Sequence, residues 1–224
     1  MLSPKGRMNG METRVQEIRA KGNKDIKIGI IPGHFATNHS HVNYYVDLTG
    51  IKSRHKMARA AAEELAKKYA VNTAVDTIIC LEGTEMIGAF LARELASANI
   101  RNMNSGNDIC VLTPETNANN QMIFRDNTQG MVWGKNVLLL IASVSTGKTI
   151  NRSVECLQYY NGRLAGIAAV FSAAREAAGM PIYSIFTEKD IPSYRTSPTT
   201  DCEQCRNKLK IDAIINSFGY SKIG

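Results

Sequence analysis

The chain has 224 residues, a formal net charge of +7 and a sequence pI of about 9.2. Its length allows one α/β domain with additions or two small domains, and 44% apolar with 21% charged residues is typical of a soluble globular protein. Lys and Arg are spread along the chain rather than clustered among aromatic residues. The charge therefore favours a small anionic ligand over nucleic acid.

The predicted elements begin with a helix at 11–20, strands at 26–31 and 42–48 and a helix at 53–69. A strand at 77–81, a helix at 86–98 and a strand at 109–112 follow. An irregular segment at 113–135 leads to a strand at 137–141 and a helix at 150–160. Strands at 166–171 and 181–186 flank an alanine-rich helix at 173–178, and the last helix spans 208–218. This alternation predicts a Rossmann-like parallel sheet flanked by helices.

We expect an N-terminal extension at 1–25, a domain at 26–190, and a C-terminal extension at 191–224 packed on the same domain. No stretch approaches the roughly 18 apolar residues of a membrane span, so no membrane contact is expected. The first 24 residues lack the apolar core of a signal peptide. Five cysteines, an odd number in a chain of this size, favour a reducing compartment, so a cytoplasmic location is expected.

The most informative segment lies between the strand at 137–141 and the helix after it. A strand, a turn rich in hydroxyl groups and a helix start together form a phosphate site, because free N–H groups and the helix dipole favour an anion there. The expected phosphate-binding residues are Ser143, Val144, Ser145, Thr146, Gly147, Lys148 and Thr149.

The same segment also fits a relaxed Walker A motif, which would run from Ala142 to Gly147-Lys148-Thr149. In a P-loop NTPase, Lys148 would reach the β- and γ-phosphates and Thr149 would bind Mg²⁺. However, alanine replaces the first glycine, and the strand at 166–171 does not end in the aspartate of a Walker B motif. This interpretation is the minor alternative.

Several segments resemble the type I phosphoribosyltransferases, and orotate phosphoribosyltransferases most of all. Thr146-Gly147-Lys148-Thr149 resembles their loop for 5-phosphoribosyl-1-pyrophosphate (PRPP), and Gly33-His34-Phe35 with Tyr44-Tyr45-Val46-Asp47 resembles their N-terminal segment. The region 76–92 is similar to their pyrophosphate loop, at Glu82, Gly83, Thr84, Glu85 and Met86. The resemblance spans roughly residues 26 to 186.

The resemblance implies a phosphoribosyltransferase-type sheet, a homodimer, and a small phosphorylated ligand, PRPP or a nucleotide. It also implies transfer of ribose 5-phosphate to a nucleobase, with Mg²⁺ if the chain is active. Two features depart from the family. Ile141 and Ala142 stand where two carboxylates hold the ribose hydroxyls, and neither side chain can accept a hydrogen bond. The loop segment 113–120 lacks the family's basic residues and adds Glu115, and Arg125 is the nearest cation.

These departures leave turnover open, so no catalytic residue is assigned. The main hypothesis is an orotate phosphoribosyltransferase-like protein that binds PRPP or a nucleoside monophosphate and transfers ribose 5-phosphate. The alternative is a non-catalytic sensor or regulator that binds the same ligands. Lys148 adds positive charge at the phosphate turn, which suits either hypothesis.

Cysteines and histidines raise the question of a metal. Cys202-Glu203-Gln204-Cys205 is a single CxxC motif, and neither a second cysteine pair nor a nearby histidine follows it. Structural zinc needs four ligands, so local packing of reduced thiols is favoured over zinc or a redox role. His34, His39 and His41 are expected to be ordinary polar or interface residues. We therefore expect no metal site.

Overall fold

The computed structural model describes residues 10–117 and 121–223. Its central sheet follows the order β10-β11-β9-β8-β4-β5, and all of its neighbours are parallel except the β10–β11 pair. The strands are β4 (Thr77–Leu81), β5 (Cys110–Leu112), β8 (Asn136–Val144), β9 (Arg163–Ser172), β10 (Glu176–Ala177) and β11 (Met180–Thr187). The expected α/β fold with a parallel sheet is confirmed.

Apolar side chains of the central strands point alternately to two cores. Leu138, Leu140 and Ala142 of β8 join a cluster with α2 (His55–Tyr69) and α3 (Glu85–Ala96). The intervening β8 side chains join a cluster with α5 (Lys148–Tyr159) on the opposite face. A strand covered on both faces is apolar throughout, which explains the continuous apolar run of β8 in the sequence.

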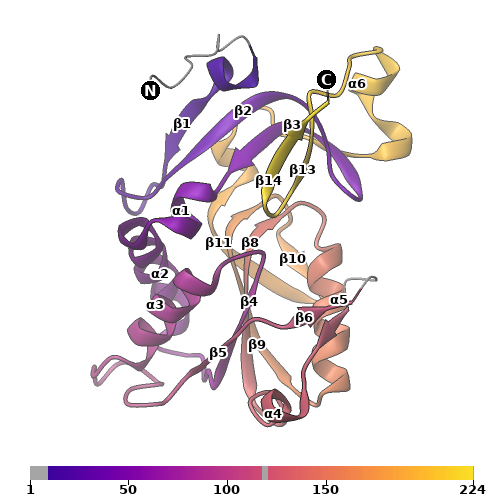
Figure 1. Ribbon diagram of the computed structural model, residues 1–224. Helices are drawn as coiled ribbons and strands as arrows, with labels where there is room; N and C mark the ends of the chain where they lie inside the picture. Colours follow the sequence, from indigo (N-terminus) through magenta and orange to yellow (C-terminus); the bar gives the residue numbers. More distant parts are fainter. Residues whose placement is uncertain (1–9, 118–120, 224) are drawn as a thin grey trace, which may run out of the picture.

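A second sheet joins the two ends of the chain and lies above the first sheet in Figure 1. Its order is β12-β3-β2-β13-β14, with β1 paired to β2. The strands are β1 (Gln16–Arg19), β2 (Lys27–Ala36), β3 (Ser40–Asp47), β12 (Thr196–Pro198), β13 (Ala213–Asn216) and β14 (Gly219–Lys222). The expected domain at 26–190 therefore contributes β2 and β3 to this sheet, and the two expected extensions contribute its other strands.

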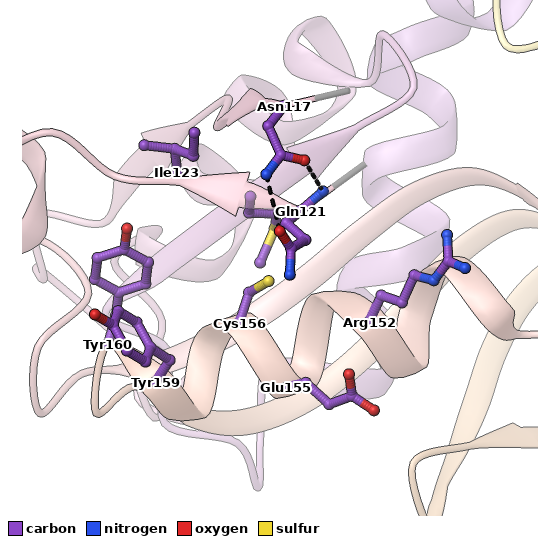
Figure 2. A pocket seen from close by; sticks show the side chains of 9 residues that line it. Asn117, Gln121, Ile123, Arg152, Glu155, Cys156, Tyr159 and Tyr160 are labelled. Carbon is purple, nitrogen blue, oxygen red and sulfur yellow. Dashed lines mark hydrogen bonds between the residues drawn. The ribbon is translucent and has the colours of Figure 1, made fainter. Parts of the chain in front are cut away.

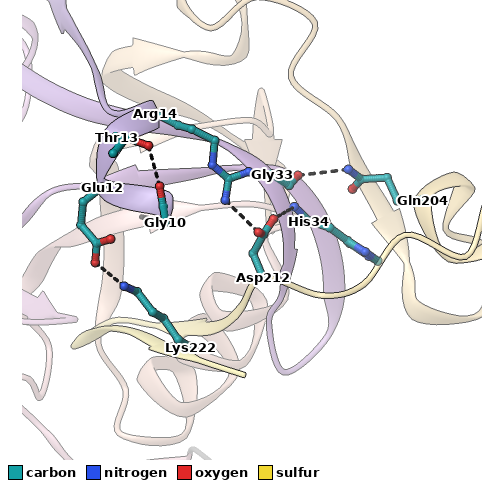
Figure 3. Close-up of polar contacts among 9 residues, drawn as sticks. All are labelled: Gly10, Glu12, Thr13, Arg14, Gly33, His34, Gln204, Asp212 and Lys222. Carbon is teal, nitrogen blue, oxygen red and sulfur yellow. Dashed lines mark hydrogen bonds and ion pairs between the residues drawn. The ribbon is translucent and has the colours of Figure 1, made fainter. Parts of the chain in front are cut away.

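Ion pairs tie the N-terminal segment to the C-terminal one (Figure 3). Arg14 pairs with Asp212 at 2.7 Å, and Glu12 pairs with Lys222 at 2.6 Å. The Asp212 carboxylate also accepts a hydrogen bond from the His34 backbone N–H at 2.8 Å. Part of the expected N-terminal extension, residues 1–9, lies outside the described residues.

The remaining elements are short. They are η1 (Met11–Arg14), α1 (Thr49–Ser53), β6 (Glu115–Thr116), β7 (Met122–Ile123), α4 (Asp126–Gln129), η2 (Glu188–Asp190), η3 (Thr199–Asp201) and α6 (Glu203–Arg206). Strands β6 and β7 pair as a separate hairpin. Among the described residues, no helix combines the length and apolar character needed to cross a membrane.

Three expected helices are wrong. Residues 11–20 form one 3-10 turn and then β1, which pairs with β2. The segment 173–178 contains β10, which pairs with the start of β11. The segment 208–218 contains β13, which pairs with β2 and β14. In each case pairing with a neighbouring strand outweighs a weak local helical pattern.

Candidate functional site

The two loops expected to bind phosphate groups lie side by side at the carboxyl edge of the central sheet. Strands β4 and β8 are paired, with Leu81 opposite Ile141. Along the chain, β4 leads through α3 to β5, which lies on one side of the β4–β8 pair. Strand β8 leads through α5 to β9, which lies on the other side. A crevice between strands whose connections diverge is where open α/β sheets bind ligands.

The expected phosphate loop consists of a strand end, a turn and a helix start. Ser143 and Val144 still belong to β8, and α5 begins at Lys148. Val144 is buried against α5, so only its backbone is available to a ligand. The turn exposes the side chains of Thr146, Lys148 and Thr149.

Gly147 shapes this turn. Its φ of 77° lies in the left-handed region, and a Cβ at this position would come within 3.2 Å of the Ala177 Cβ. No side chain caps α5 at its N-terminus. Among the described residues, the N–H groups of the first helical turn have no side-chain acceptor, as an anion site requires.

The turn after β4 is fixed by a buried threonine. Thr84 is fully buried, and its hydroxyl contacts the carbonyl oxygens of Leu81 at 3.0 Å and Leu140 at 3.1 Å. Glu82 and Gly83 both have positive φ, at 60° and 78°. A non-glycine residue in this region is strained and is often found at functional sites. Glu85 and Met86, which begin α3, are exposed.

Glu82 does not simply flank its turn but crosses to the neighbouring strand. Its carboxylate accepts hydrogen bonds from the Ser143 backbone N–H at 3.1 Å and the Ser143 hydroxyl at 3.2 Å. Burial raises the pKa of this carboxyl group, and the Ser143 hydrogen bonds and the Lys52 charge oppose the shift only in part. The crevice therefore holds a carboxyl group that ionises less readily than usual.

Replacing this carboxyl group should change how stability depends on pH. A raised pKa in the folded state means that Glu82 contributes stability below its unfolded pKa of about 4.3, and that the contribution is lost as pH rises through the folded pKa. The Glu82→Gln variant should therefore gain stability relative to the wild type between pH 4 and pH 8, as measured by urea denaturation.

The matched control for this prediction is Glu85→Gln, on the same turn. Its side chain is exposed, so its replacement should change stability much less than that of Glu82. An equal gain in both variants, or a loss for Glu82→Gln at pH 8, would contradict the role given to burial.

The tip of the β13–β14 hairpin closes the crevice from above. Lys52 donates hydrogen bonds from its Nζ to the Glu82 carbonyl at 3.0 Å and to the Ser217 carbonyl at 2.5 Å. The cavity beneath has a volume of about 30 Å³, which suits water rather than a nucleotide. Sequence reasoning missed both Lys52 and the hairpin, because the contact joins residues that are 165 positions apart.

The two positions without carboxylates are part of the core. Ile141 is 1% exposed and packs in the α5 cluster, and Ala142 is 2% exposed and packs in the α2–α3 cluster. Among the described residues, Glu82 supplies the only carboxylate that lines the small cavity.

The irregular segment at 113–135 forms the β6–β7 hairpin beside α5 (Figure 2). Arg125, the expected substitute cation, pairs with Glu115 of this hairpin at 2.6 Å. Residues 118–120 of the expected loop lie outside the described residues. A groove of about 520 Å³ separates the hairpin from α5. It is lined by Arg152, Glu155, Cys156 and Tyr159, beyond the first turn of the helix, so it is separate from the crevice.

The cysteines and histidines that sequence reasoning treated separately lie close together at the second sheet, which is called the upper sheet below. His34, His41, Cys202 and Cys205 place their ligand atoms within 4.8 Å of one another. His39 is exposed and does not belong to this group. No histidine follows the CxxC motif in the sequence, but in the structure β2 and β3 bring two histidines to it from far away in the sequence.

The molecule is thus an α/β protein with a two-loop crevice at its switch point. Solved structures to which it is similar include UMP synthase of Leishmania donovani, at 18% identity and a TM-score of 0.48, covering 66% of this chain and 30% of that one. This chain therefore spans less than a third of that protein.

Two further similar structures match most of their own length. An adenine phosphoribosyltransferase of Thermoanaerobacter pseudethanolicus is 18% identical, with a TM-score of 0.48, and the match covers 79% of this chain and 97% of that one. The Mycobacterium tuberculosis orotate phosphoribosyltransferase in complex with PRPP is 18% identical, with a TM-score of 0.48 and coverage of 66% and 82%. These are phosphoribosyltransferases, the family that the sequence motifs resemble. No family model and no curated protein matches the sequence.

Proposed function

We propose that this protein binds the phosphate of PRPP or of a nucleoside monophosphate at residues 143–149. The observation that carries the proposal is the position of the turn at the switch point of the sheet, with Gly147 in the left-handed region before an N-terminus of α5 that no side chain caps. Thr146, Lys148 and Thr149 are exposed around it and supply two hydroxyl groups and a cation. Together these groups can surround a phosphate dianion.

The same geometry favours binding over transfer of the sugar. Buried Ile141 and Ala142 offer no acceptor to ribose hydroxyls, and the ion pair with Glu115 already engages Arg125. Losing two charge-assisted hydrogen bonds at roughly 1.5–3 kcal/mol each weakens ribose binding by roughly 3–6 kcal/mol. A sensor or regulator that binds a phosphorylated ligand is therefore favoured, with Mg²⁺-dependent transfer to a base as the second candidate.

An NTPase is the least supported candidate. Ala142, at the first position of the relaxed Walker A motif, is buried within β8 rather than at the start of a loop. Strand β9 ends at Ser172 without an aspartate. We expect a homodimer in the cytoplasm, as the family resemblance and the cysteine content suggest.

A ligand that extends from the phosphate turn into the cavity beneath the hairpin tip at 216–219 must displace that tip, because the cavity holds only about 30 Å³. That movement breaks the hydrogen bond from Lys52 to Ser217. Binding should therefore couple to the position of the C-terminal segment, a property suited to a sensor.

A ligand screen tests the proposal. PRPP and nucleoside monophosphates should raise the melting temperature with or without Mg²⁺, and ATP should raise it less. Lys148→Ala should weaken binding about 10-fold to 100-fold, because it removes one charge-assisted contact. Lys135→Ala, an exposed lysine just before β8 at its opposite end, serves as the matched control and should bind normally.

Two results would change the conclusion. If no phosphate compound shifts the melting temperature or binds in calorimetry, the phosphate site does not exist. Release of pyrophosphate from PRPP with any nucleobase would establish transfer and remove the sensor interpretation.

A further inference from the structure

Four side chains from three segments converge in the upper sheet, away from the crevice. His34 lies on β2 and His41 on β3, and Cys202 and Cys205 flank the start of α6. His41 lies opposite Ala36, and His34 lies in the stretch of β2 between Pro32 and Phe35 where the register to β3 shifts. The two imidazoles meet across this strand pair, with ring centroids 5.0 Å apart.

Four of the six distances among the ligand atoms are close to the edges of a tetrahedron around one ion, and all six are within 4.8 Å. His34 Nε2 lies 3.1 Å from His41 Nδ1, 3.5 Å from Cys202 Sγ and 3.7 Å from Cys205 Sγ. Cys205 Sγ lies 3.3 Å from His41 Nδ1. With Zn–N near 2.05 Å and Zn–S near 2.3 Å, a regular tetrahedron has edges of about 3.3 Å between nitrogens and about 3.5 Å between nitrogen and sulfur.

The surroundings orient the first histidine for coordination. His34 is 2% exposed, and its Nδ1 lies 3.0 Å from the Leu209 carbonyl oxygen. A carbonyl can only accept, so Nδ1 carries the proton and Nε2 presents its lone pair to the cluster. Metal-binding histidines are commonly held by such a hydrogen bond.

The loop that carries the cysteines is also held in place. Gln204, between them, donates a hydrogen bond from Nε2 to the Gly33 carbonyl at 3.1 Å (Figure 3). Arg206 pairs with Asp201 across the same short segment. Cys202 is 4% exposed, whereas Cys205 lies at the surface. The CxxC motif is therefore fixed against β2 before any ion binds.

We propose that His34, His41, Cys202 and Cys205 bind one zinc ion as a structural Cys₂His₂ site. Four protein ligands leave no open position, so the ion stabilises the fold rather than activating water. It joins β2 and β3 to the C-terminal segment, which carries the β13–β14 hairpin over the crevice. The zinc ion thus helps to hold the β13–β14 hairpin, whose tip contacts Lys52, in position.

Metal analysis of the purified full chain tests the proposal directly. The protein should contain close to one zinc per chain, and Co²⁺ exchange should give the visible bands of tetrahedral cobalt with thiolate charge-transfer absorption. Cys205→Ser should lower zinc affinity at least about 100-fold, because it removes a ligand rather than a supporting contact. His41→Ala is a second variant from a different segment and should behave in the same way.

The matched control is Cys156→Ser, a half-buried cysteine on α5 outside the cluster, which should keep full zinc content. Chelation should lower the melting temperature of the wild type and of the control by more than about 5 °C, but that of Cys205→Ser much less. Metal content below a tenth of an ion per chain after refolding with stoichiometric zinc, together with no cobalt spectrum, would overturn the proposal. So would a disulfide between Cys202 and Cys205 under reducing purification.

Discussion

Replacing Gly147 with valine should abolish phosphate binding, with the dissociation constant rising at least about 100-fold, equivalent to about 2.7 kcal/mol. The backbone at this position has a φ of 77°, and a β-branched side chain is strongly disfavoured there. The added Cβ would also come within 3.2 Å of the Ala177 Cβ. The turn must therefore change shape, and the first N–H groups of α5 lose their common direction.

Calorimetric titration with PRPP and a nucleoside monophosphate measures this loss. Gly134→Val is the matched control, because Gly134 has a φ of 70°, has no neighbouring atom within 4 Å of an added Cβ, and lies before the opposite end of β8. Both variants carry a backbone penalty of about 1–2 kcal/mol, but only the first should lose the ligand. Equal affinities in the two variants would show that the turn at 145–149 does not form the phosphate site.

The second large effect is expected from Ile141→Asp, which places a carboxylate where phosphoribosyltransferases have one. We expect the free energy of unfolding to fall by about 3–5 kcal/mol. Ile141 is 1% exposed and packs between β8 and α5. The change removes buried apolar area and adds a charge that no cation of this cluster can neutralise. We also expect no pyrophosphate release from PRPP, because the new carboxylate faces the core.

Urea denaturation at neutral pH measures the loss of stability. Ile214→Asp is the control, because it makes the same chemical change on strand β13, where the side chain is 51% exposed. It should cost less than about 1 kcal/mol. If Ile141→Asp were as stable as Ile214→Asp and turned over PRPP, position 141 would face the ligand rather than the core.

The sequence alone predicts most of the central sheet. Strands that are covered on both faces need continuous apolar runs, and β4, β8 and β9 show them plainly. The helices α2, α3 and α5 follow from stripes of apolar residues at helical spacing. The glycine turn before α5 was also visible, because Gly147 and its hydroxyl-bearing neighbours are a local signal between a strand and a helix.

The terminal segments were harder to predict, for a physical reason. Strands β1, β13 and β14 are short and partly exposed, so they contain few of the alternating apolar residues that distinguish a strand. They become strands because the edge of β2 opposite β3 offers backbone groups to β1 and β13, and β13 in turn pairs with β14. The helix expected at 208–218 failed for this reason.

Local sequence thus determined the central strands, the helices and the glycine turn before α5, because each depends on residues within a few positions of one another. Tertiary structure alone decided which distant side chains meet. It placed the Glu82 carboxylate on Ser143, the hairpin tip on Lys52, and two histidines beside the CxxC motif. Those contacts join segments up to 171 residues apart. They depend on strand order and register, which the spacing of residues along the chain does not reveal.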